Sequence, residues 1–443
     1  MKKLINAVEQ YKSFILEAEE YLRKHPETGF KEYENSAYLA ARFQELGYSL
    51  VYAEGITGFY AVYDTGKPGP EVLVLAELDA LTCPLHKDAN KQTGAAHACG
   101  HHAQCAALLG VAAALKSAGE RAPICGRVRL CVVPAEEFLE IEYRQKLRKD
   151  GKIKYLNGKT EFLSRGMFNG VDLAFMVHTG NSFCAERGSI GFLSKRIIYK
   201  GVSAHAGGAP HLGKNALYAA NCGLNAVNAL RETFCEKDLI RWHPILTAGG
   251  TAVNVIPETA VIESQLRGAS FEAIERENEK INRALCGAAV SFGVGIEIED
   301  EPGYAPYENN AQLLSVAKEA LAEIKEEEPF GYYDGYATGS TDVGDLACIM
   351  PVLMVYCGGA SGRAHAADYE ITSPILACVE SAKWQLAMLG LLLKEQGERA
   401  KEIVKNYQPQ YATKEEYLQS LDRRRSVREP IAYLPNGEII VKK

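Results

Sequence analysis

The sequence lacks the features that mark membrane, exported and nucleic-acid-binding proteins. It has no uninterrupted apolar stretch approaching the roughly 18 residues that cross a bilayer. Its first residues, Met1-Lys2-Lys3, precede an amphipathic helical pattern rather than an apolar signal core. It also has no excess of positive charge, because its formal net charge is -7. We therefore expect a cytoplasmic protein that binds neither a membrane nor nucleic acid.

The sequence also lacks a disulfide framework, internal repeats and low-complexity segments. Its 12 cysteines are not packed into a short, loop-rich region. They are scattered through apolar segments, as Cys105, Cys131, Cys222 and Cys286 illustrate. We expect most of them to be reduced core residues.

What is present indicates two globular domains. A chain of 443 residues is too long for one ordinary core, and 47% hydrophobic residues suffice to bury two. An apolar strand over 71–76, a helix over 103–116 and a second apolar strand over 128–133 follow one another. This order predicts an α/β fold with a mostly parallel central sheet.

The predicted order of helices and strands changes near Gly188, and the α/β order resumes after Pro302. Between them the pattern predicts a two-layer α+β module with strands at 192–199, 253–256, 261–266 and 294–298. We therefore predict a split α/β domain, an inserted domain, and a polar C-terminal extension of unassigned role in which Asn436-Gly437 could close a hairpin. Their predicted boundaries are 1–188 with 303–395, 189–302, and 396–443.

Side chains that bind metals follow the predicted strands. The strand over 128–133 leads into Glu136-Glu137, and ligand sites of open α/β sheets lie at such strand ends. Sulfur, nitrogen and carboxylate donors suit zinc, or manganese and cobalt with less preference for sulfur. Five candidates are too many for one tetrahedral site and fit two metals that share a bridging ligand. The candidates are Cys99, His101, Glu137, His178 and His365.

Each candidate taken alone has an ordinary structural alternative. Cys99 could be a buried thiol beside a surface histidine, His178 a capped strand-end residue, His365 a loop residue and Glu137 a surface acid. The joint pattern favours the metal site, because several of only 10 histidines fall at strand ends or glycine turns.

Four motifs resemble those of the zinc amidohydrolases of the aminoacylase and carboxypeptidase family. The nearest branch is that of the auxin-conjugate hydrolases and aminobenzoyl-glutamate utilisation protein B, and the resemblance extends from residue 5 to about residue 395. It implies a zinc-peptidase-like catalytic domain interrupted by a smaller lid domain that dimerises. The motifs are His97-Ala98-Cys99-Gly100-His101, Ala135-Glu136-Glu137, Asn254-Val255-Ile256-Pro257 and Gly339-Ser340-Thr341-Asp342.

The resemblance implies roles for individual residues. Cys99 would bridge two divalent ions, with Glu137 and His365 completing one site and His101 and His178 the other. Zinc is the expected metal, with manganese or cobalt as alternatives.

The same resemblance implies the catalytic and substrate-binding residues. Glu136 would be the general base and Asp79 would orient a metal ligand or the base. His205 of the lid would reach across a homodimer to polarise the scissile carbonyl. Asn254 and Arg267 would hold the substrate, and Arg267 would do so by pairing with the carboxylate of the substrate. Asp79 could otherwise be a strand-end cap, Asn254 a turn former and Arg267 a surface residue.

The chain departs from the family pattern in two places. His102 stands where family members usually carry aspartate, and Gln104 where they often carry histidine. A charged excursion beginning at Phe138-Leu139-Glu140 and reaching Lys154 replaces a glycine-rich turn. These differences could alter the pocket and the surroundings of the metals.

Three functions remain open at this stage. The first is a metal-dependent amidohydrolase acting on a small amide next to a carboxylate: an N-acyl amino acid, a dipeptide or an aminobenzoyl-glutamate-like compound. The second is a catalytically weak or metal-poor member that serves as a ligand-binding or partner subunit. The third uses Cys99 as a nucleophile paired with His101, although no separate orienting group is evident.

Overall fold

The computed structural model describes residues 1–119 and 122–442, and these form two compact units. The large unit consists of Met1–Gly188, Glu308–Tyr336 and Asp345–Lys414. The small unit consists of Ser189–Tyr307, Ala337–Gly344 and Glu415–Lys443. The C-terminal extension is thus divided between the two units.

A mixed, mostly parallel sheet forms the centre of the large unit. Strands β3, β6, β7 and β15 pair in parallel, whereas β1, β2 and β6 pair antiparallel. This confirms the predicted α/β fold. In order across the sheet the strands are β1 (Leu50–Tyr52), β2 (Phe59–Asp64), β6 (Arg127–Val133), β3 (Glu71–Glu77), β7 (Leu173–Thr179), β15 (Val352–Cys357), β8 (Cys184–Ser189) and β13 (Tyr307–Glu308), with β14 (Gly331–Ala337) pairing with β8.

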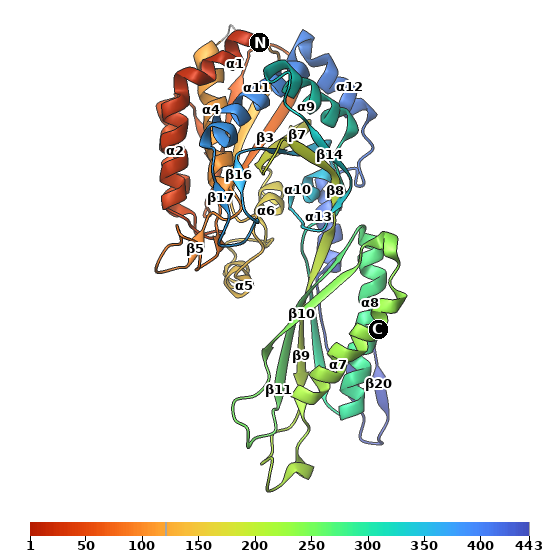
Figure 1. The fold of residues 1–443 in the computed structure, drawn as a ribbon. Helices are drawn as coiled ribbons and strands as arrows, with labels where there is room; N and C mark the ends of the chain where they lie inside the picture. Colours follow the sequence, from red (N-terminus) through yellow and green to blue (C-terminus); the bar gives the residue numbers. More distant parts are fainter. Residues whose placement is uncertain (120–121, 443) are drawn as a thin grey trace. The chain divides into compact units, whose positions relative to one another are not determined.

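Helices from distant parts of the chain pack together in the large unit, and Figure 1 shows α2, α4 and α11 side by side. Their apolar side chains share one core with the sheet. A 3-10 turn at Val8–Tyr11 interrupts the amphipathic helical pattern near the start of the chain. The helices are α1 (Lys2–Ala7), α2 (Lys12–Lys24), α3 (Tyr33–Glu45), α4 (His101–Ala118), α5 (Ile141–Lys149), α6 (Gly158–Ser164), α9 (Ala311–Ile324), α11 (Ser381–Leu393) and α12 (Glu398–Asn406).

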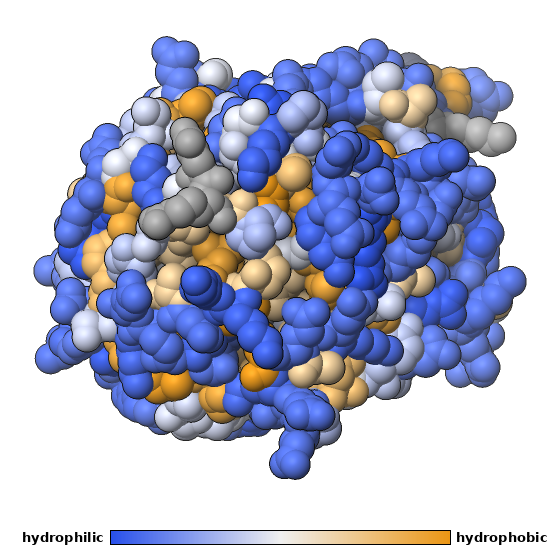
Figure 2. Space-filling view, turned by 90° about the horizontal axis from the view of Figure 1, so that it is seen from above, coloured by the Kyte–Doolittle hydropathy of each residue, from blue (hydrophilic) through white to orange (hydrophobic). Residues whose placement is uncertain are grey.

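The helical segment Ile375–Leu393 is long and apolar enough to cross a membrane, a possibility that was not predicted from the sequence. It includes α11, and 78% of the apolar window is buried inside the structure. A core helix passes the same test, so this segment is weak evidence for a membrane. Figure 2 shows that hydrophilic residues predominate on one face, with smaller apolar areas between them.

The small unit is an antiparallel sheet covered by α7 (Ala216–Leu230) and α8 (Phe271–Phe292), as Figure 1 shows. The prediction of a strand at 253–256 is wrong, because these residues form a turn and an isolated β-bridge. Strand β10 was not predicted. In order, the strands are β10 (Arg241–Ala248), β11 (Thr259–Gly268), β9 (Gly191–Lys200), β12 (Gly295–Pro302) and β18 (Ser426–Arg428).

The last part of the chain completes this sheet. Strand β18 pairs antiparallel with β12, and Arg428 donates to Asp300 at 2.6 Å. The fully buried Lys195 ammonium also contacts Asp300. The predicted hairpin exists: β19 (Ile431–Tyr433) pairs with β20 (Ile439–Val441) around Asn436-Gly437.

Candidate active site

The carboxyl ends of the parallel strands bring the five predicted metal ligands together. Their donor atoms form two groups in which all atoms lie within 4.8 Å of one another. Cys99 belongs to both groups, so the arrangement has the shared ligand that a two-metal site requires. The groups are Cys99 with His101 and His178, and Cys99 with Glu137 and His365.

Contacts within each group are close. Cys99 Sγ lies 3.6 Å from His178 Nε2, and His365 Nε2 lies 3.1 Å from Glu137 Oε1. His365 has a positive φ of 65°, unusual for a residue other than glycine. Its backbone N–H donates to the Ala98 carbonyl at 2.8 Å, which ties this loop to the segment that carries Cys99.

Gly100 allows Cys99 and His101 to lie on either side of a sharp bend. Its φ is 88°, in the left-handed region that glycine enters without strain. A Cβ atom at this position would lie 2.4 Å from the Tyr369 hydroxyl oxygen and 2.9 Å from Thr179 Cβ. Helix α4 begins at the next residue, His101.

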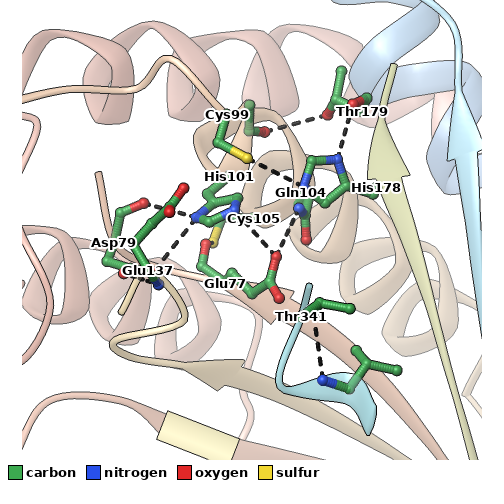
Figure 3. A network of polar contacts seen from close by, with 12 residues as sticks. Glu77, Asp79, Cys99, His101, Gln104, Cys105, Glu137, His178, Thr179 and Thr341 are labelled. Carbon is green, nitrogen blue, oxygen red and sulfur yellow. Dashed lines mark hydrogen bonds and ion pairs between the residues drawn. The ribbon is translucent and has the colours of Figure 1, made fainter. Parts of the chain in front are cut away.

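Backbone carbonyls set the orientation of two imidazoles. His101 Nδ1 donates to the Asp79 carbonyl at 2.8 Å, and His178 Nδ1 donates to the Thr179 carbonyl at 2.9 Å. Both rings therefore present Nε2 to the cluster, as Figure 3 shows for Cys99 and His178. The Asp79 carboxylate accepts from the Glu137 backbone N–H at 2.8 Å, which matches the orienting role expected of Asp79.

The surroundings shift the proton affinities of the cluster. Burial opposes ionisation of the Cys99 thiol, but the charges of His101 and His178 outweigh it and hold the pKa of Cys99 well below its ordinary value. Burial and then the Cys99 thiolate raise the pKa of Glu137 to about 7. Hydrogen bonds that the His365 ring donates to Cys99 and Glu137 raise the pKa of His365 to about 11. The Cys99 thiol therefore ionises readily, whereas Glu137 and His365 hold their protons more tightly than usual.

The residues fit divalent metal ions. His101 Nε2 and Glu137 Oε1 are buried atoms that face other ionisable groups, with Glu77 Oε2 3.3 Å from the first and His365 Nε2 3.1 Å from the second. One thiolate, three imidazoles and a carboxylate form a donor set suited to zinc and neighbouring transition metals. An ion would take the place of the protons that the isolated cluster holds.

Glu136, the predicted general base, lies beside this donor set. Its carboxylate belongs to a group with His101 and Glu137 whose donor atoms lie within 4.8 Å of one another. The side chain is buried, with 8% exposure. Neighbouring Glu136 and Glu137 can therefore take different roles at one site.

Two residues next to the cluster were missed by the sequence analysis. The fully buried Lys159 donates to Glu77 at 2.5 Å, and Glu77 Oε2 lies 3.3 Å from His101 Nε2. Gln104 donates to the same carboxylate at 3.0 Å, which places this departure from the family pattern directly behind a predicted ligand. In the sequence, the apolar run 72–76 directly before Glu77 is a local sign that this carboxylate is buried.

His102, the other departure, points elsewhere. Its Nε2 lies 3.4 Å from Glu19 Oε1 of α2, and its ring lies 4.9 Å from that of His97. It is absent from the groups of metal-ligand candidates found among the described residues.

The three predicted substrate-side residues belong to the small unit. His205 is exposed, and its Nδ1 accepts from the Gly208 backbone N–H at 2.9 Å. Asn254 is a neighbour of this segment, since its carbonyl accepts from Ala206 N–H at 2.9 Å. Arg267 lies on β11 and donates to Ser340 Oγ at 2.9 Å. The structure joins His205 and Asn254, while Arg267 has its own partners.

Comparison with known proteins assigns the family. A relative from Haemophilus influenzae, named as the homolog of one p-aminobenzoyl-glutamate hydrolase subunit, is 30% identical over 61% of this chain and 63% of its own. An indole-3-acetyl-aspartic acid hydrolase from Enterobacter agglomerans is 29% identical over 55% of each chain. The chain thus spans less than two thirds of the length of these two relatives.

A solved structure shows the same fold, and a family model covers most of the chain. The structure is a dinuclear metal-binding peptidase of the M20 family from Bacillus subtilis, with a TM-score of 0.66, 21% identity, and coverage of 87% of this chain and 99% of that one. Residues 73–387 match the model described as Peptidase family M20/M25/M40. This match confirms the family resemblance of the motifs, and the chain belongs to the peptidase family M20/M25/M40.

Proposed function

We propose that the protein is a metal-dependent amidohydrolase acting on a small amide next to a free carboxylate. The observation that carries this proposal is the pair of donor groups sharing Cys99, with the Glu136 carboxylate beside them. The names of the two relatives support the substrate class, because p-aminobenzoyl-glutamate and indole-3-acetyl-aspartate are both amides of an acidic amino acid. N-acyl amino acids and dipeptides share this chemistry.

The residues divide the work of hydrolysis. Divalent ions held by the two groups would activate a water molecule and polarise the scissile carbonyl. Glu136 takes a proton from the attacking water and returns it to the nitrogen of the leaving amine. Asp79 holds His101 through its carbonyl and Glu137 through its carboxylate, so both ligands keep their direction. We propose zinc as the metal, with manganese or cobalt as substitutes.

The small unit would supply the substrate side. His205 and Asn254 would contact the scissile carbonyl and the substrate, and Arg267 would bind its carboxylate. We further propose a homodimer in which His205 serves the partner's site, and a cytoplasmic location. The location is supported by free thiols at all 12 cysteines.

Metal loading and a Glu136 variant test the proposal. The protein is loaded with zinc, manganese or cobalt and assayed on p-aminobenzoyl-glutamate, indole-3-acetyl-aspartate and N-acetyl amino acids. Glu136→Gln should keep the metal and lose about 100- to 10,000-fold in kcat, because the proton carrier is gone. Metal content well below one ion per chain, with no hydrolysis after metal addition, contradicts the proposal. Full activity of Glu136→Gln contradicts the role of the base and favours the Cys99 nucleophile.

A further inference from the structure

The charged excursion after Glu137 folds into α5 and sends one arginine into the interior of the large unit. Arg144 is fully buried, with 0% exposure. Its guanidinium donates to the carbonyls of Ala135 at 3.3 Å and Leu156 at 2.6 Å, and also to the carbonyl of Glu137. Two of these three carbonyls flank Glu136.

The turn that carries Glu136 and Glu137 has an unusual backbone. Ala135 has a φ of 55°, a conformation that costs free energy for a residue with a Cβ atom. Such a turn persists only where its surroundings hold it. Ala135 N–H donates to Glu32 at 2.8 Å and Glu137 N–H donates to Asp79 at 2.8 Å, while Arg144 binds both carbonyls.

The guanidinium lies in an apolar setting. Ala135 shares a small hydrophobic cluster with Phe30, with Leu147 and Ile153 of the excursion, and with Leu156 just after it. The Arg144 guanidinium carbon is 5.5 Å from the centre of the Phe30 ring. Hydrogen bonds are stronger where water is excluded, so these contacts constrain the turn more than surface contacts would.

A second buried arginine offers a comparison. Arg129 lies near the start of β6, at the other end of the strand that leads into the Glu136 turn. It donates to the Glu71 carboxylate at 2.6 Å and to the Asn169 carbonyl at 3.0 Å. Arg129 is thus a buried arginine that also binds backbone carbonyls, pairs in addition with a carboxylate, and has these partners away from the turn.

We propose that Arg144 is a positioning residue for the Glu136–Glu137 turn, through which the excursion sets the direction of the general base and of one metal ligand. The effect of Arg144 on catalysis rests on the proposed function. The effect of Arg144 on metal binding by Glu137 does not. Under this proposal the excursion contributes to the active site, although it lies outside the central sheet.

Cobalt binding tests the effect on the ligand without requiring catalysis. Arg144→Met and Arg129→Met are titrated with cobalt and followed by visible absorption. Arg144→Met should bind cobalt about 10- to 100-fold more weakly with a changed spectrum, as loss of groups that orient ligands does. Arg129→Met should bind as the wild type does. A folded Arg144→Met with wild-type affinity and spectrum overturns the proposal.

Kinetics test the effect on the base. If the wild type hydrolyses amides, Arg144→Lys should lower kcat about 100-fold with little change in KM, because a misplaced group loses that much. Guanidinium ion below denaturing concentrations should restore part of the activity of Arg144→Ala but not of Arg129→Ala. Equal loss in the Arg129 variants, or an unchanged kcat for Arg144→Lys, overturns the positioning role.

A third variant keeps the proposal testable should the arginine substitutions prevent folding. A Cβ atom on Gly29 would lie 2.3 Å from Arg144 Nη2 and 2.9 Å from Ala135 Cα. Gly29→Ala therefore presses on the guanidinium and on the Ala135 backbone that it holds, without removing the arginine, and cobalt binding should weaken as in Arg144→Met. Wild-type cobalt binding by Gly29→Ala overturns the proposal. A wild type that binds cobalt but hydrolyses no amide contradicts the proposed function, and cobalt binding still decides the role of Arg144.

Discussion

Cys99 is one of 12 cysteines, yet its surroundings separate it from the others. Two imidazoles hold the pKa of its thiol well below the ordinary range, whereas burial raises the pKa of the Cys105 thiol, six residues later on α4. Only a thiol that ionises readily makes a good metal ligand. The two cysteines therefore form a natural pair for experiment.

Cys99→Ala should lose metal and Cys105→Ala should keep it. Removing the shared donor weakens both groups, while Cys105 only donates to the Glu77 carbonyl. Elemental analysis after dialysis against a weak chelator measures the difference. Equal metal content in the two variants would contradict Cys99 as the bridging ligand.

The Lys159–Glu77 pair makes a prediction about stability and pH. Burial alone would raise the pKa of the Glu77 carboxyl, but the charges of Lys159, His101 and His178 together outweigh it, Lys159 contributing most, and the pKa falls to about 2. The pair therefore stabilises the fold above pH 4.5, and this contribution is lost as pH falls towards 2. Lys159→Met should lower the free energy of unfolding by about 3–5 kcal/mol at neutral pH, since it leaves a buried charge unpaired.

Urea unfolding at pH 7 and at pH 4 measures this effect. The difference between wild type and Lys159→Met should shrink at the lower pH, because Glu77 in the variant takes up a proton more readily. Lys159→Met combined with Glu77→Gln should recover part of the loss. A difference that grows on acidification would contradict this account.

At the scale of elements, Gly158 shows how closely α6 packs against the residues that precede the Glu136–Glu137 turn. A Cβ atom at Gly158 would lie 1.6 Å from the Pro134 carbonyl oxygen, which belongs to the backbone and cannot easily move. Gly287, exposed in the middle of α8, has nothing within 4 Å of its Cβ position.

Alanine at these two glycines should have opposite effects. Gly158→Ala should cost about 1–3 kcal/mol through overpacking and should also weaken metal binding. Gly287→Ala should gain about 0.5–1 kcal/mol, because glycine in a helix interior is unfavourable. Thermal unfolding of both variants checks the signs. Unchanged stability of Gly158→Ala would show that α6 yields easily.

The sequence allowed the parallel strands and their polar ends to be predicted, because hydrophobic runs and strand-end residues are local patterns. Cys99, Glu137 and His178 were predicted as metal ligands in this way. The roles of Arg144 and Lys159 could not be predicted from the sequence. A charged residue in a polar stretch is expected to be exposed until the fold of that part of the chain is known. The pairing of β18 with β12 is equally invisible, since the two strands are more than a hundred residues apart.

At the scale of the whole molecule, the proposed dimer makes a prediction about mixtures. His205→Ala and Glu136→Gln should each be inactive alone. If His205 serves the partner's site, a mixed dimer holds one site with both residues intact, and random exchange restores about a quarter of wild-type activity. The activity of mixtures after exchange of protomers measures this. No recovery, with exchange shown by mass-tagged chains, would indicate that His205 serves its own chain.

Strand β18 also has a consequence for biosynthesis. The edge of β12 is covered by residues that leave the ribosome more than a hundred positions after β12 itself. During that interval the nascent small unit presents an open strand edge, the kind of surface that recruits other strands. The large unit likewise waits for Asp345–Lys414, so it is complete only after two of the three segments of the small unit have been made. Newly made chains should therefore be most prone to pair with other strands before β18 has been made.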